Sequence, residues 1–215
     1  MPVNDLDMLL VHRVFRRELD DLTWLIARVQ PGDNSRARIV GSHLRFMTEA
    51  LHHHHAAEDE LVWPIVSARA LDRKSDIERM QAQHGQIATA LEEVHAARVA
   101  WTKFVQRSTT ARMKEAFAQL SELVSVHLDD EERDALPAIV EHLTPREWGT
   151  AVNRGASFLI KHPRWGVVLG GVVLDYATPE EGRSFLGGVP VPQRFLVEAL
   201  GPRSLAAYRR KLYDV

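Results

Sequence analysis

The chain of 215 residues contains no cysteine. Disulfides, thiolate metal sites, iron–sulfur clusters and cysteine nucleophiles are therefore excluded together. Long apolar runs are also missing, since the longest, at 166–174, is far shorter than the roughly 20 residues that cross a bilayer. Any metal site must use nitrogen and oxygen ligands, and no membrane partner is expected.

The sequence has no large excess of charge of either sign. A formal net charge of -2 gives no electrostatic footprint for nucleic acid, so no nucleic-acid partner is expected. The first residues lack the basic start and apolar run of a signal peptide, which predicts a cytoplasmic protein. Hydrophobic content of 45% and charged content of 26% indicate an ordinary globular chain.

Two near-repeats of histidine and glutamate dominate what is present. His54 precedes Glu58 by four residues, and His127 precedes Glu131 by the same interval. A lone histidine precedes each pair, His12 by 42 residues and His84 by 43. Each pair is also followed by a proline, Pro64 or Pro137, which is expected to kink or loosen its helix one to two turns beyond the glutamate. The chain thus repeats one pattern: a histidine, a long spacer, then His-x-x-x-Glu.

Four amphipathic helices are predicted, at about 4–29, 35–68, 76–105 and 109–142. Apolar residues recur in each at steps of three and four, which defines a buried helix face. The histidines and glutamates of the repeat occupy positions on these apolar stripes. We therefore predict an all-α protein, with an up-down-up-down four-helix bundle at 1–143.

The four consecutive histidines from His52 to His55 cannot all face the bundle interior, because successive helical residues turn by about 100°. Only His54 continues the apolar stripe. His55 is next nearest to the interior and is a possible seventh ligand, whereas His52 and His53 are expected in solvent. His43, His95 and His142 fall off the stripes and are assigned no role.

Residues 144–215 have a different character and are predicted to form an extension of short helices. Thr144 and Thr178 each precede Pro-x-Glu, the pattern of a capped helix start. Breaks are expected at 187–192 and at Gly201-Pro202. No ligand cluster occurs here, so the extension is expected to pack on the bundle or to serve a protein partner.

On a helix, residues four apart share one face, so each His-x-x-x-Glu pair can converge on metal. Six candidate ligands result: His12, His54, Glu58, His84, His127 and Glu131. Four imidazoles and two carboxylates suit a pair of ions roughly 3.5–4 Å apart, and favour iron or manganese. The alternative is a metal-free histidine–glutamate network in a helical scaffold.

These six positions, with Trp63-Pro64 and Leu136-Pro137, resemble the hemerythrin-like (HHE cation-binding) family over about 4–142. The resemblance implies a four-helix bundle with two non-haem iron ions, often oxo- or hydroxo-bridged. The extension is similar to one on some bacterial members. The chain departs from the oxygen carriers of the family at two places: Ala88 stands where they have a histidine, and Glu131 replaces their aspartate one residue further on.

These departures argue against a reversible oxygen carrier and for the branch of the family that handles iron, oxygen, nitric oxide or peroxide. The first functional hypothesis is a binding or sensing protein for O2, NO or peroxide. The second is a di-iron enzyme with catalase-like or peroxide- or NO-reducing activity. The sequence does not separate the two, because both need the same metal ligands.

Overall fold

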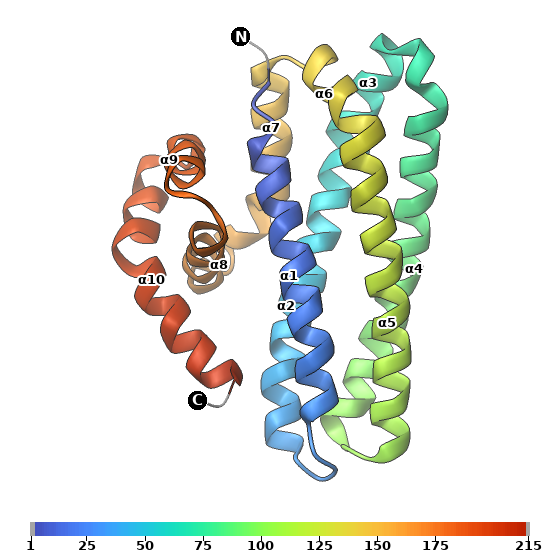
Figure 1. Ribbon diagram of the computed structural model, residues 1–215, viewed down its shortest axis with the longest axis vertical. Coiled ribbons are helices and arrows are strands. Elements are labelled where there is room, and N and C mark those ends of the chain that lie inside the picture. The colour runs from blue at the N-terminus through green and yellow to red at the C-terminus, as the bar shows by residue number, and fades with distance from the viewer. Residues whose placement is uncertain (1–2, 214–215) are drawn as a thin grey trace.

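The computed structural model describes residues 3–213, and the regular elements within that range are all helical. Four long helices lie side by side and alternate in direction (Figure 1). They are α1 (Leu6–Arg28), α2 (Asn34–Ala57), α4 (Lys74–Lys103) and α5 (Arg107–Asp130). The predicted all-α bundle with added C-terminal helices is confirmed.

The turn between α1 and α2 shows how local sequence ends one helix and begins the next. Gly32 takes a φ of 86°, a conformation that glycine adopts without steric cost. Asp33 then caps α2 by accepting a hydrogen bond from the backbone N–H of Arg36.

Two of the predicted long helices contain a wide π-helical segment at their glutamate. The first is η1 (Glu58–Val62), which leads into α3 (Trp63–Arg69) and the short η2 (Leu71–Arg73). The second is η3 (Glu131–Ala135), which leads into α6 (Leu136–His142). The sequence prediction placed the disturbance one to two turns beyond each glutamate, whereas it begins at the glutamate itself.

Proline accounts for both wide turns. Pro64 cannot donate a backbone hydrogen bond, and its ring crowds the carbonyl four residues earlier. The preceding Trp63 N–H bonds to the carbonyl of Glu58, five residues back, and Leu136 N–H bonds to the carbonyl of Glu131 in the same way. Such segments often occur at functional sites.

The apolar core consists of two clusters that lie on either side of one polar layer. The larger includes Phe15 and Leu51, and the smaller includes Met8 and Trp63. Along each bundle helix the candidate ligands fall between residues of one cluster and residues of the other. The core thus closes the polar layer from both ends.

The extension packs against one side of the bundle, beside α1 and α2 (Figure 1). It comprises α7 (Pro145–Ala156), η4 (Ser157–Ile160), α8 (Pro163–Tyr176), α9 (Pro179–Gly188) and α10 (Val191–Tyr213). The predicted helix starts at Thr144 and Thr178 are confirmed, since each forms a capping box with a glutamate. No helix in the described range is long and apolar enough to span a membrane.

The predicted break at Gly201-Pro202 is wrong, because α10 continues through it. Pro202 leaves the carbonyl of Glu198 without its helical donor, but Glu198 is exposed and water can replace that bond. Gly201 packs on α8, where a Cβ on Gly171 would stand only 2.7 Å from its carbonyl oxygen. This close helix–helix contact holds α10 against α8 at the Gly-Pro pair, and α10 bends without ending (Figure 1).

Candidate metal centre

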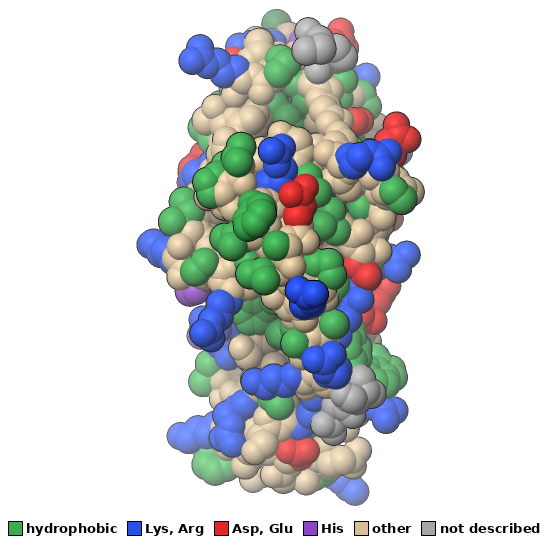
Figure 2. All heavy atoms as spheres, turned by 90° about the vertical axis from the view of Figure 1, so that its left-hand side faces the viewer, with side chains coloured by type: hydrophobic (Ala, Val, Ile, Leu, Met, Phe, Trp, Pro, Cys, Tyr) green, Lys and Arg blue, Asp and Glu red, His purple; other side chains and the backbone are tan. Residues whose placement is uncertain are grey.

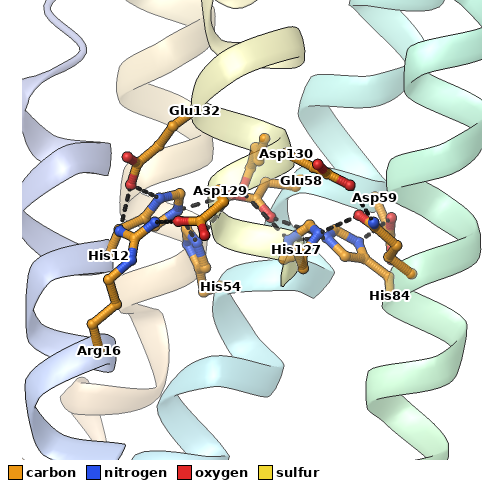
Figure 3. A network of polar contacts seen from close by, with 12 residues as sticks. His12, Arg16, His54, Glu58, Asp59, His84, His127, Asp129, Asp130 and Glu132 are labelled. Carbon is orange, nitrogen blue, oxygen red and sulfur yellow. Dashed lines mark hydrogen bonds and ion pairs between the residues drawn. The ribbon is translucent and has the colours of Figure 1, made fainter. Parts of the chain in front are cut away.

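The bundle brings all six predicted ligands into one layer of its interior. Figure 3 labels His12, His54, Glu58, His84 and His127 within this layer. The predicted ligands form two groups whose ligand atoms lie within 4.8 Å of one another. The first group contains His12, His54 and Glu131. The second contains Glu58, His84 and His127, together with His55.

The first group joins side chains from three elements of the bundle. Nε2 of His12 on α1 lies 3.2 Å from Nε2 of His54 on α2. The same His12 nitrogen is 3.3 Å from Oε2 of Glu131, at the start of η3. His12 and Glu131 are completely buried, and the side chain of His54 is 15% exposed.

The second group repeats this arrangement around His84. Nε2 of His84 on α4 lies 3.2 Å from Nε2 of His127 on α5. His55, from α2, stacks on the His84 ring with centroids 4.1 Å apart and meets the His127 ring edge-on at 4.8 Å. The structure therefore places His55 inside the site, the possibility that the sequence had left open.

The two glutamates lie between the groups. Glu58 directs Oε1 to within 3.2 Å of His54 and Oε2 to within 3.6 Å of His84, one oxygen to each group. Oε2 of Glu131 is 3.3 Å from His12 and 3.4 Å from His127. Both carboxylates are thus positioned to bridge two ions.

Outer carboxylates orient the two lone histidines. Nδ1 of His12 donates to Glu132 at 2.9 Å, and Nδ1 of His84 donates to Asp59 at 2.8 Å. With the proton held at Nδ1, the Nε2 lone pair of each ring faces the centre, as metal-bound histidines require. Glu132 and Asp59 directly follow the two inner glutamates, so the repeat extends one residue further than sequence reasoning recognised.

His127 is oriented by an amide instead. Its Nδ1 donates to Oε1 of Gln83 at 3.1 Å, and Nε2 of Gln83 donates to Asp130 at 2.8 Å. Arg133 and Arg79 continue this network to the surface. Nothing in the sequence pattern singled out Gln83, because it lies beside the repeat rather than within it.

Burial and neighbouring charges set the protonation of the metal-free layer, and two neighbouring carboxylates raise the pKa of His12 against the effect of its burial. Burial, helped by neighbouring His12, lowers the pKa of His54 to about 3, and burial also depresses the pKa of His55. Both imidazoles are then neutral near neutral pH and can bind metal without releasing a proton. Burial and the nearby Glu131 raise the pKa of Glu58, because two carboxylates close together resist double ionisation.

The donor atoms fit two metal ions. Both oxygens of Glu58, both oxygens of Glu131 and Nε2 of His55 are buried without a hydrogen-bond partner. Buried polar atoms that lack partners are costly. Imidazole nitrogens that share one ion at about 2.0–2.1 Å stand roughly 3 Å apart, as the paired Nε2 atoms do here. Cations would satisfy every one of these atoms.

The remaining histidines lie outside the two groups. His52 is exposed as predicted, but His53 stacks on Phe158 of the extension at 4.9 Å and is only partly exposed. His43, given no role from the sequence, is buried and lies 3.0 Å from Glu18. His43 lies off the apolar stripe of α2 and faces the extension, where its ring is 5.7 Å from that of Tyr208. The apolar stripes predict only the contacts among the bundle helices.

A four-helix bundle with a buried layer of imidazoles and carboxylates is typical of bundles that bind metal ions between facing helices. Residues 7–139 match the family described as Hemerythrin HHE cation binding domain. This match covers more than half of the chain, so the protein belongs to that family. No curated protein and no solved structure shows significant similarity to the chain.

Proposed function

We propose that the protein holds two iron ions in this layer and uses them to bind a small oxidant, O2, NO or peroxide, in sensing, storage or stress response. The observation that carries the proposal is the set of unpartnered nitrogen and oxygen atoms between the two groups. A nitrogen- and oxygen-rich set with carboxylate bridges favours iron or manganese over softer metals.

The chain offers more histidines to one of the two ions than to the other. His12 and His54 serve one ion, and His55, His84 and His127 serve the other, with Glu58 and Glu131 shared. Two irons bound there would supply a redox pair with room for a small ligand. Seven protein groups leave positions open on two six-coordinate ions, fewest at the ion near His55.

The apolar clusters above and below the layer restrict what reaches it. Leu51 and Phe15 close one side, and Trp63 and Met80 close the other. Such walls exclude bulk water and favour small neutral ligands over large polar substrates. The ring of Phe15 lies 5.4 Å from that of His54, the most exposed of the ligands.

The extension supports a sensing role, because it contacts the turns that carry ligands. Arg13, next to His12, binds Glu181 of α9 through two hydrogen bonds of 2.9 and 3.0 Å. Glu60, in the turn begun by Glu58, pairs with Arg154 of α7 at 2.7 Å. A change in metal state that shifts these turns would reach the extension, and through it a protein partner.

The second candidate is catalysis of peroxide or NO reduction at the same ions. The two candidates differ in turnover. Iron-loaded protein mixed with hydrogen peroxide in a stopped-flow spectrometer should react once per iron pair if it binds or senses. Many cycles per iron pair would overturn the binding proposal in favour of a catalase-like enzyme.

A further inference from the structure

The indole N–H of Trp63 has no hydrogen-bond partner, although the residue is completely buried. A buried indole N–H usually has an acceptor, because leaving a donor unpaired away from water costs free energy. Trp101, also completely buried, follows this rule and donates to the hydroxyl oxygen of Thr110 at 3.2 Å. The unpaired donor of Trp63 therefore indicates that an acceptor binds beside it.

The apolar surroundings of this indole supply no side-chain acceptor. Trp63 belongs to the smaller core cluster, whose members are hydrophobic side chains. Bulk water does not reach it either, since the residue is completely buried and α7 of the extension packs on η1, the turn before it. Figure 2 shows the extension side of the molecule, where hydrophobic side chains gather at the surface and histidine is scarcely visible. The metal layer and its apolar wall are thus covered on that side.

The indole lies against the metal layer. Side chains of a helix lean toward its N-terminus, so that of Trp63, the first residue of α3, leans back over the turn that begins at Glu58. The centroid of its ring is 6.1 Å from that of His84, one of the ligands. A small molecule bound at the ion beside His84 would therefore lie next to the indole.

The sequence repeat shows that the wall itself does not need an indole. Trp63 stands five residues after Glu58 and directly before a proline. The matching residue, five after Glu131 and again before a proline, is Leu136, which is buried in the same cluster. An aliphatic side chain is enough to close the layer at that position. The N–H donor is therefore what distinguishes the first repeat from the second.

We propose that the indole N–H of Trp63 donates a hydrogen bond to a small ligand bound at the metal pair, and so selects ligands that carry a good acceptor atom. This inference rests on the proposed binding of O2, NO or peroxide. Each of these ligands presents an oxygen whose lone pairs can accept from the indole. A ligand without such an atom would leave the donor unpaired and would be held less tightly.

Infrared spectra of NO bound to the iron-loaded chain test this contact. A hydrogen bond to the NO oxygen draws electron density onto the ligand and lowers the N–O stretching frequency. Trp63→Phe removes the N–H and keeps an aromatic ring, so the frequency should rise. NO should also dissociate about 2–10-fold faster, since one hydrogen bond is lost. The iron content of each protein is measured alongside, so that a loss of metal is not mistaken for a loss of this contact.

Trp148→Phe is the matched control. Trp148 is a buried tryptophan of the same cluster, but on α7 it lies about 10 Å along the helix from Gly155, the residue beside His54. This variant should keep the native frequency and dissociation rate. A second variant carries at position 63 a tryptophan analogue in which sulfur replaces the N–H. It preserves both rings, and should shift the frequency as Trp63→Phe does even if the smaller phenylalanine disturbs packing.

The outcomes separate this inference from the function on which it rests. NO that binds with the native frequency and rate in both position-63 variants, at unchanged iron content, would overturn the role of Trp63 and leave the metal centre as a ligand-binding site. An iron-loaded native chain that binds no NO would overturn NO binding itself, and the contact with Trp63 along with it.

Discussion

The carboxylate of Glu132 lies 2.9 Å from Nδ1 of His12, although 120 residues separate the two in the chain. Asp59 holds His84 in the same way. Each inner glutamate is thus followed by a residue that orients the lone histidine of the other repeat. The two halves of the sequence depend on each other to aim their imidazoles.

Neutralising these outer carboxylates should weaken metal binding. Glu132→Gln and Asp59→Asn keep the shape of the side chain but remove its negative charge. That charge makes the Nε2 atom of each imidazole a stronger metal ligand. We expect metal affinity to fall about 10–100-fold in each, measured by competition with a chelator. Glu115→Gln, an exposed change on α5, is the control. Unchanged affinity in both variants would contradict an orienting role.

His55→Ala should remove one of two metal equivalents, because Glu58, His84 and His127 alone make a poorer site. The metal-to-protein ratio after gel filtration measures this loss. His52→Ala alters an exposed neighbour in the same histidine run and should retain both ions. A full complement of metal in His55→Ala would show that His55 only packs against the centre.

A larger residue at Gly155 should disturb the metal centre through the extension. A Cβ there would lie 3.6 Å from Ala57 Cβ and 4.0 Å from Cα of His54, so Gly155→Leu would push α7 away from α2. We expect a loss of about 1–3 kcal/mol in stability and a shifted absorption spectrum of the metal-loaded protein.

Gly149→Leu offers a control on the same helix, because a side chain at Gly149 meets open space. It should leave both melting temperature and spectrum unchanged. An unaltered spectrum in a destabilised Gly155→Leu protein would argue against coupling between the extension and the metal centre.

The buried Glu18 should make stability depend on pH. Burial alone would raise the pKa of Glu18, but His43 at 3.0 Å and the Tyr176 hydroxyl at 2.8 Å lower it below the ordinary 4.5. A carboxylate with a depressed folded-state pKa contributes stability above pH 4.5. That contribution is lost as the pH falls through the lowered value.

Glu18→Gln should therefore cost about 1–3 kcal/mol at neutral pH, and the difference from the native chain should shrink in acid. Urea unfolding across this pH range measures it. Asp20→Asn, an exposed change on the same helix, should have no such effect. A constant difference at all pH values would show that the charge of Glu18 is not what stabilises the interface.

The fold and the inner ligands could be predicted from the sequence because both follow helical periodicity. His12 and Glu131 interrupt apolar stripes, and a polar residue there is conspicuous. Gln83 and Asp59 could not be found in this way, because each lies off the apolar stripe of its own helix. Each also binds a histidine that belongs to a different helix. The continuation of α10 through Pro202 depends on contact with α8, a tertiary relationship that local turn signals cannot report.

The central claim is that the layer between the two apolar clusters holds two iron ions. Mass-spectrometric metal analysis and an absorption spectrum of untagged protein, made in iron-replete medium, test it most directly. The account predicts close to two irons per chain with ligand-to-iron bands in the near ultraviolet. Protein without iron that also fails to take it up on reconstitution would contradict the account.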